Sequence, residues 1–177
     1  MKKLQNRNMV VVMLALGLVL IVAVWQVLVW NDTRIIKAGS DIMEKLDQES
    51  NYQVDVDLVD FQKDNFPTTK DWITISGWLM CQGKSVDTAS IKIVLKKVGT
   101  DDFYILPTTM TQRTDVTEWA NDGGKYDWSG FSVKIPRGGR IEIDRYDYEI
   151  YALYDLNYEG EKLVALNTTM KEWKKDE

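Results

Sequence analysis

The chain has no histidine among its 177 residues, and it has one cysteine and three prolines. Without histidine, Ser-His-Asp and Cys-His nucleophile systems and a histidine-ligated catalytic zinc are excluded. The single cysteine, Cys81, excludes an internal disulfide, and the alternating apolar pattern around it predicts a buried thiol rather than a nucleophile. Carboxylate pairs of the glycosidase type stay open, although most Asp and Glu residues alternate with apolar residues, as on a solvated sheet face. We therefore expect no enzymatic activity, no cofactor and no metal.

A long segment without any charged side chain, residues 9–30, follows Lys2, Lys3 and Arg7 near the N-terminus. About 20 apolar residues cross a bilayer as a helix, whereas the apolar core of a cleaved signal peptide has about 7–15. We expect residues 9–30 to form an uncleaved transmembrane helix, with residues 1–8 as a cytoplasmic tail held inside by its positive charge. The rest of a single-pass protein of the cell membrane then lies outside the cell.

The part of the chain beyond this segment is acidic. The chain contains 27 acidic and 22 basic residues, and three of the basic ones precede the apolar segment. A negatively charged surface repels nucleic acid and anionic lipid headgroups at long range. Nucleic acid is therefore excluded as the expected partner.

The pattern after the apolar segment predicts a stalk and one domain. In residues 31–50, Ile35, Ile42 and Leu46 recur near helical spacing, which is typical of a short amphipathic helix in a juxtamembrane stalk. Such a helix could pack on the domain, on a partner helix, or on nothing. From residue 51 to 177 the period changes to two, which indicates half-buried strands in one extracytoplasmic domain.

Seven or eight short strands separated by turns predict an all-β fold, an antiparallel β-sandwich of immunoglobulin-like or jelly-roll-like type behind one N-terminal transmembrane helix. In the longest non-periodic stretch, residues 107–125, Thr114 or Asp115 could cap one helical turn. The expected strands cover residues 52–58, 71–80, 91–95, 103–106, 129–135, 140–143, 146–156 and 163–166.

Oxygen donors gather in one expected loop, where Asn121, Asp122 and Asp127 flank Gly123 and Gly124. Such donors suit calcium, but their spacing does not match an EF-hand loop. A polar turn is the favoured interpretation, and calcium binding stays open.

Aromatic residues are the better indication of function. Rings on a rigid sheet can stack on the apolar face of a sugar, while nearby polar side chains bond its hydroxyls. The alternative is that these large rings fill the core of the sandwich. The glycan-binding candidates are Trp72, Trp78, Trp119, Tyr126 and Trp128, with Arg113 and Asp115 as polar contacts.

Six short motifs occur in a fixed order over residues 52–157: ISGWL (75–79), IKIVLK (91–96), FYILP (103–107), RTDV (113–116), YDWSGFSV (126–133) and YEIY (148–151). The series resembles a β-sandwich domain found beside membrane glycosyltransferases and other surface-polysaccharide assembly proteins of Gram-positive bacteria. The resemblance implies a non-catalytic module that acts at the outer membrane face during glycan assembly. It supplies no known ligand residues. Because this chain has one expected span and no transferase domain, the resemblance points to a separate accessory subunit.

The sequence therefore favours one function and leaves one alternative. The first is a membrane-anchored, non-catalytic accessory protein of cell-surface polysaccharide assembly that binds glycan or a membrane glycosyltransferase. The alternative is a purely protein-docking subunit of a multi-span membrane complex without glycan affinity. Ala15, Gly17 and Ala23 in the apolar segment give the alternative a small-residue packing signal.

Overall fold

The computed structural model describes residues 2–32, 35–48, 51–62, 72–136 and 140–173. Contacts between residues divide the chain into two compact units, Met1–Arg34 and Ile35–Glu177. We call the second of these the β unit.

The first unit contains one α-helix, α1 (Lys2–Asp32), which includes the whole uncharged segment 9–30. Leucine, methionine and alanine favour the helix, and no proline interrupts it. Large apolar side chains described along α1 are exposed, among them Met9, Leu14, Leu18 and Trp25. Among the described residues, no helix is long and apolar enough to cross a membrane.

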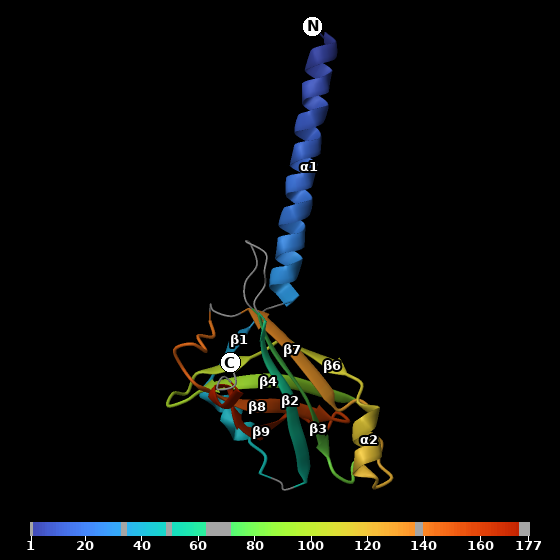
Figure 1. The fold of residues 1–177 in the computed structure, drawn as a ribbon, viewed down its shortest axis with the longest axis vertical. Coiled ribbons are helices and arrows are strands. Elements are labelled where there is room, and N and C mark those ends of the chain that lie inside the picture. Colours follow the sequence, from blue (N-terminus) through green and yellow to red (C-terminus); the bar gives the residue numbers. More distant parts are fainter. Residues whose placement is uncertain (1, 33–34, 49–50, 63–71, 137–139, 174–177) are drawn as a thin grey trace. The chain divides into compact units, whose positions relative to one another are not determined.

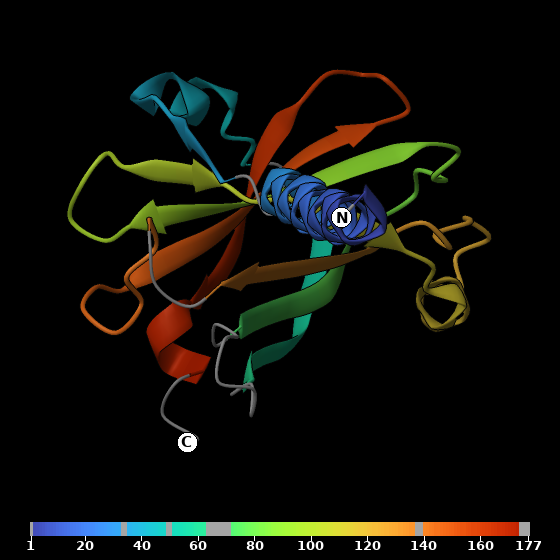
Figure 2. The same cartoon turned by 90° about the horizontal axis from the view of Figure 1, so that it is seen from above.

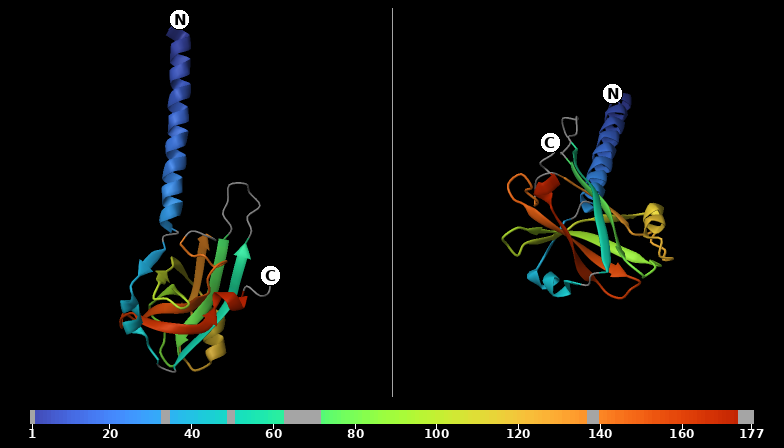
Figure 3. Two further views of the ribbon diagram at one scale, coloured as in Figure 1. Left: turned by 90° about the vertical axis from the view of Figure 1, so that its left-hand side faces the viewer. Right: turned by 60° about the horizontal axis from the view of Figure 1, so that its bottom comes forward.

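Two antiparallel sheets make up the β unit. Sheet A comprises, in spatial order, β1 (Ile36–Ala38), β5 (Phe103–Ile105), β4 (Ala89–Lys97), β8 (Tyr148–Leu156) and β9 (Lys162–Thr169). Sheet B comprises β2 (Tyr52–Gln62), β3 (Trp72–Cys81), β7 (Gly130–Pro136) and β6 (Thr108–Thr111). In Figure 1 strands β2 and β3 cross in front of β4, β8 and β9, and Figure 3 shows the two sheets from two further sides. This architecture is an antiparallel β-sandwich, as predicted.

Three short helices accompany the sheets: the 3₁₀ helix η1 (Ser40–Lys45), α2 (Thr114–Ala120) and α3 (Met170–Trp173). Helix α2 lies at the periphery of the β unit (Figure 2). It is longer than the single turn predicted for this region. The N-cap residue of α2 is Arg113, which makes no side-chain capping bond. Thr114 and Asp115 belong to the first turn of the helix, so neither is its cap.

The core lies between the sheets and follows the alternation in the sequence. Ile73, Ile75 and Leu79 of β3 are fully buried in it, and so are Ile93 and Leu95 of β4. A second apolar cluster covers the other face of sheet A and is formed by Ile42, Val94, Phe103, Leu153 and Leu163. Part of the outer face of sheet A is thus covered as well, which explains why Val94 and Leu153 add apolar residues to the simple alternation of β4 and β8.

The expected stalk is not a separate segment where the structure describes it, in residues 35–48. Strand β1 pairs with β5, and Ile42 of η1 is buried against sheet A. The short amphipathic helix predicted from the spacing of Ile35, Ile42 and Leu46 is present as the 3₁₀ helix η1, and it packs on the domain through Ile42. The boundary between the two compact units falls after Arg34, whereas the sequence placed the start of the domain at residue 51.

Two strands were missed by the sequence and one was wrong. Strand β1 is three residues long, and β6 has the sequence Thr-Thr-Met-Thr, so neither shows an alternating apolar pattern. The expected strand over 140–143 is instead a turn region in which Ile141 and Ile143 are buried. Two buried isoleucines separated by one residue suit a strand, but here they fill the core from a loop. The predicted start of another strand at residue 71 lies outside the described residues.

Candidate functional site

The outer face of sheet B carries mostly polar side chains. Because Ile73, Ile75 and Leu79 point into the core, the residues between them on β3 point outward. Strand pairing aligns these residues with outward-facing ones of β2, β7 and β6. We call this surface the polar face; it comprises Asp55, Asp60, Trp72, Thr74, Ser76, Trp78, Thr109, Thr111, Ser132 and Lys134.

Hydroxyl groups lie in the middle of the polar face. Ser76 pairs with Ser132, which pairs in turn with Thr109 of β6. The Ser76 and Ser132 hydroxyl oxygens are 3.1 Å apart, and both side chains are half-buried while Thr109 is exposed. Rigid strands hold these donors and acceptors in a row, which suits recognition of a ligand that is itself rich in hydroxyls.

Two tryptophans of strand β3 lie on the polar face, Trp72 as its first residue and Trp78 six residues later. Trp72 is half-buried, and the Nζ atom of Lys134 lies 5.2 Å from the centre of its ring. Six residues later, Trp78 is only 9% exposed, because Trp119 of α2 packs on it with ring centres 5.4 Å apart. At about 3.3 Å per residue, the two tryptophans of β3 stand roughly 20 Å apart, so the polar face could accommodate an extended ligand.

Arg113 ties α2 to the edge of sheet B. Its Nη2 atom donates to the Asp115 carboxylate at 2.8 Å, its Nε atom donates to the same group at 2.9 Å, and its Nη1 atom pairs with Asp57. The β2–β3 pairing shifts between Val56 and Leu58, so Asp57 is the extra residue of a β-bulge. The hydrogen bonds that Arg113 donates to Asp115 raise the pKa of Arg113, and the guanidinium lowers the pKa of Asp115. The polar groups of Arg113 and Asp115 are therefore already paired with each other within the protein.

The loop after α2 is held by Tyr126 and Asp122. The fully buried Tyr126 donates from its hydroxyl to Asp122 at 2.7 Å and accepts the Gly83 N–H at 2.9 Å. Asp122 also accepts the Gly124 N–H at 2.8 Å, and these donors lower the pKa of its carboxyl group. Asp127 in turn accepts a hydrogen bond from Thr117 at 2.6 Å.

This arrangement bears on the open question of calcium at Asn121, Asp122 and Asp127. The two carboxylates point to separate protein donors, and Asn121 is the left-handed residue that ends α2. Within the described residues, no group of three or more Cys, Asp and Glu side chains is placed to hold a metal ion.

Replacing Tyr126 by phenylalanine is expected to lower the free energy of unfolding by about 2 kcal/mol, because two hydrogen bonds of a buried hydroxyl are lost. Tyr154 provides the matched control. Its hydroxyl is buried and has no hydrogen-bond partner in the described part of the chain, so Tyr154→Phe should cost nothing or stabilise the fold. Denaturant unfolding followed by near-UV circular dichroism measures both. Equal losses in the two variants would contradict the role assigned to Tyr126.

We expect stability to be nearly constant between about pH 5.5 and 8, because the chain has no histidine to titrate there. Asp115 and Asp122 have pKa values below their usual range in the folded state, through Arg113 and Tyr126 respectively. A carboxyl group whose pKa is lowered by folding stabilises the folded state at pH values above its pKa in the unfolded chain. This stabilisation is lost as the pH falls toward its pKa in the folded state. The melting temperature should therefore drop only below about pH 4. A transition centred between about pH 6 and 7 would contradict this expectation.

The seven candidate residues separate into distinct roles. Trp119 and Trp128 are exposed by 62% and 49%, as a stacking platform requires, and Trp72 lies at one end of the polar face. The prediction that Tyr126 is a stacking platform was wrong, because its side chain is fully buried. Trp78 points outward as predicted but is almost covered by Trp119, so it supports that ring rather than offering its own face.

Asp55 and the hydroxyl row of the polar face were not among the residues predicted from the sequence. Asp55 is exposed and lies directly opposite Trp78 in the β2–β3 pairing. A signal for both was available, because Thr74 and Ser76 alternate with the buried isoleucines of β3. Their neighbours on β7 and β6, Ser132 and Thr109, could be identified only from the pairing of the strands.

Comparisons of the chain with known protein families, with curated proteins and with solved structures found no match.

Proposed function

We propose that this chain is a membrane-anchored, non-catalytic accessory protein of bacterial cell-surface polysaccharide assembly whose β unit binds glycan at the outer face of the membrane. In this proposal α1 is the single transmembrane span, and Lys2, Lys3 and Arg7 keep the N-terminus in the cytoplasm. The uncharged segment 9–30 and the exposed apolar side chains of α1 support the anchor. An immunoglobulin-like or jelly-roll-like type of sandwich remains part of the proposal.

The polar face of sheet B is the observation that carries the glycan-binding proposal. It combines a row of serine and threonine hydroxyls with Trp72 at one end and the exposed Trp119 at the other. Sugars present both hydroxyls and apolar ring faces, so a flat sheet that offers both kinds of contact is complementary to them. The order of the six motifs, which resembles that of Gram-positive polysaccharide-assembly domains, also supports the proposal.

Retention on purified Gram-positive cell walls, and on the soluble polysaccharides released from them, tests this proposal. The full chain should be used in a polyoxyethylene detergent, because sugar-based detergents would compete. We expect Trp72→Ala and Trp119→Ala each to weaken retention by roughly tenfold, the equivalent of about 1.4 kcal/mol. Tyr158→Asn is the matched control, since Tyr158 is 85% exposed in the turn between β8 and β9 of sheet A and asparagine tolerates its positive φ.

Trp128→Ala belongs in the same series because its ring is exposed but no ring contact joins it to Trp78 or Trp119 in the described residues. Folded protein that no wall preparation retains would remove the glycan-binding proposal. Unchanged affinity in Trp128→Ala would remove that residue alone from the site.

The second candidate is a protein-docking subunit that holds a multi-span membrane glycosyltransferase through its helix. The exposed apolar surface of α1, with the small residues Ala15, Gly17 and Ala23, favours it. Replacing residues 9–30 by an unrelated apolar helix separates the two functions. A glycan-binding protein should keep its wall retention, whereas a subunit docked through the helix should lose co-purification with its transferase.

A further inference from the structure

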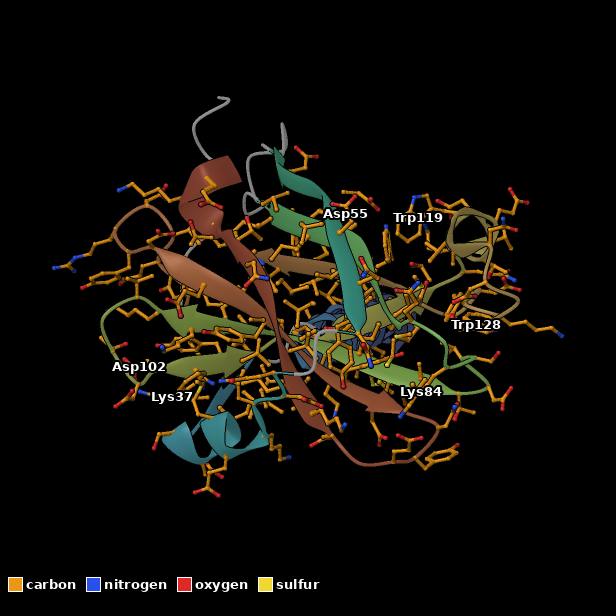
Figure 4. The ribbon with its side chains drawn as sticks, turned by 90° about the horizontal axis from the view of Figure 1, so that it is seen from below. Lys37, Asp55, Lys84, Asp102, Trp119 and Trp128 are labelled. Carbon is orange, nitrogen blue, oxygen red and sulfur yellow. The ribbon has the colours of Figure 1, made fainter. Side chains whose placement is uncertain are left out.

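One corner of the polar face combines two indole rings with a carboxylate. The Trp78 and Trp119 rings meet at an interplanar angle of 53°, and Trp119 keeps 62% of its surface exposed. Asp55 is the residue paired with Trp78 across the β2–β3 ladder, and directly opposed side chains have Cβ atoms about 4.5–5.5 Å apart. We call Asp55, Trp78 and Trp119 the acidic aromatic corner. Figure 4 labels Asp55 on β2 and Trp119 on α2.

The charges around this corner are predominantly negative. Arg113 is already matched by Asp57 and Asp115, so the three groups together carry one negative charge. Asp55 and Glu118, the residue before Trp119, are both exposed. Lys134 lies over the Trp72 ring, at the other end of β3. A ligand that approaches the corner therefore meets an aromatic surface inside a negative field.

An indole face and a nearby carboxylate are together selective for organic cations. The negative face of the ring attracts an ammonium group, and Trp is the strongest of the aromatic side chains in this respect. A neutral sugar could stack on the ring and donate a hydroxyl hydrogen bond to the Asp55 carboxylate, but it would bring no positive charge to balance the negative field. An anionic polymer would be repelled. The corner is thus better matched to a positively charged group than to the hydroxyls that the rest of the polar face suits.

We propose that the acidic aromatic corner binds an alkylammonium group carried by the glycan. This inference rests on the proposed function and narrows its ligand class. Two sources share this chemistry, the protonated amine of an amino sugar and a quaternary ammonium substituent such as choline. A primary amine donates hydrogen bonds to Asp55, whereas a quaternary ammonium has no donor and depends mainly on Trp119.

Two matched pairs of probes test the proposal on the full chain in a polyoxyethylene detergent. The first pair is choline and dimethylbutanol, in which carbon replaces the charged nitrogen. The second is a glucosamine tetramer and its fully N-acetylated counterpart. Titration calorimetry should show one cation bound at least about tenfold more tightly than its neutral partner. Preference for choline identifies a quaternary substituent, and preference for the glucosamine tetramer identifies an amino sugar.

Two variants locate the binding. Trp119→Leu and Asp55→Asn should each weaken binding of the preferred cation by roughly fivefold, with the larger loss in Trp119→Leu for choline and in Asp55→Asn for the amino sugar. Asp101→Asn and Tyr158→Asn should change nothing. Asp101 is exposed next to Asp102, which lies on the opposite side of the β unit from Trp119 in Figure 4. Near-UV circular dichroism confirms that each variant is folded.

Equal binding of the charged and neutral members of both pairs would overturn the ammonium inference and leave glycan binding in place. A charge preference that survives in both Trp119→Leu and Asp55→Asn would overturn the assignment to this corner. Failure of all four probes, together with retention on cell walls, would overturn the inference alone. Failure of the probes and of wall retention would overturn the proposed function as well.

Discussion

Gly77→Ala is expected to lower the free energy of unfolding by about 3 kcal/mol or more, the upper range for overpacking a close-packed interior. A Cβ atom at Gly77 would overlap the Asp55 carbonyl oxygen and lie 2.8 Å from Cζ of Phe131 and 3.0 Å from Cα of Val56. Two of these three neighbours are backbone atoms of β2, which cannot move aside without breaking the pairing with β3. Denaturant unfolding of the full chain measures the loss.

Ser76→Ala, one position earlier on the same strand, is the matched control for Gly77→Ala. It removes one hydroxyl contact on the outer face, and we expect a loss of about 1 kcal/mol. The bulge at Asp57 begins beside the Gly77 pairing, so Gly77→Ala should also loosen the bond between Asp57 and Arg113. If Gly77→Ala proved as stable as Ser76→Ala, the close approach of β2 to Gly77 would be wrong.

The strands that the sequence predicted well are those whose burial follows a local rule. In β3 and β4, apolar residues at every second position face one core. This pattern is visible in the local sequence, so it can be recognised without the positions of the neighbouring strands. Cys81 is buried for the same reason, as expected. Strand β6 could not be found in this way, because its threonine-rich sequence has no alternating apolar pattern. Its position in the sheet is defined by its pairing with β7.

The candidate site was only partly predictable, since burial there depends on segments far apart in the chain. The alternation placed Trp78 on the outer face correctly, but α2 begins 36 residues later and covers it with Trp119. Tyr126 lies in an irregular loop, and only the positions of Asp122 and Gly83 show that its hydroxyl points inward. The residue types therefore suggested an aromatic site, but which of its rings a ligand can reach depends on the packing of distant segments in the fold.

Trp78→Ala is expected to lower the free energy of unfolding by about 3–5 kcal/mol, as for other large aromatic side chains removed from a core. Trp78 is 9% exposed, and its removal leaves a cavity between the outer face of sheet B and α2. Chemical denaturation monitored by near-UV circular dichroism measures the loss.

Trp119→Ala separates packing from ligand binding at the same pair of rings. Because Trp119 is 62% exposed, its removal should cost only about 1 kcal/mol, mainly the ring contact with Trp78, while glycan retention should fall. Trp78→Phe should lie between the two in stability, since it keeps an aromatic ring under α2. The opposite order, with Trp119→Ala far more destabilising than Trp78→Ala, would mean that α2 holds sheet B through Trp119. Trp119 would then be a structural residue, and both the stacking platform and the acidic aromatic corner would lose the ring on which they depend.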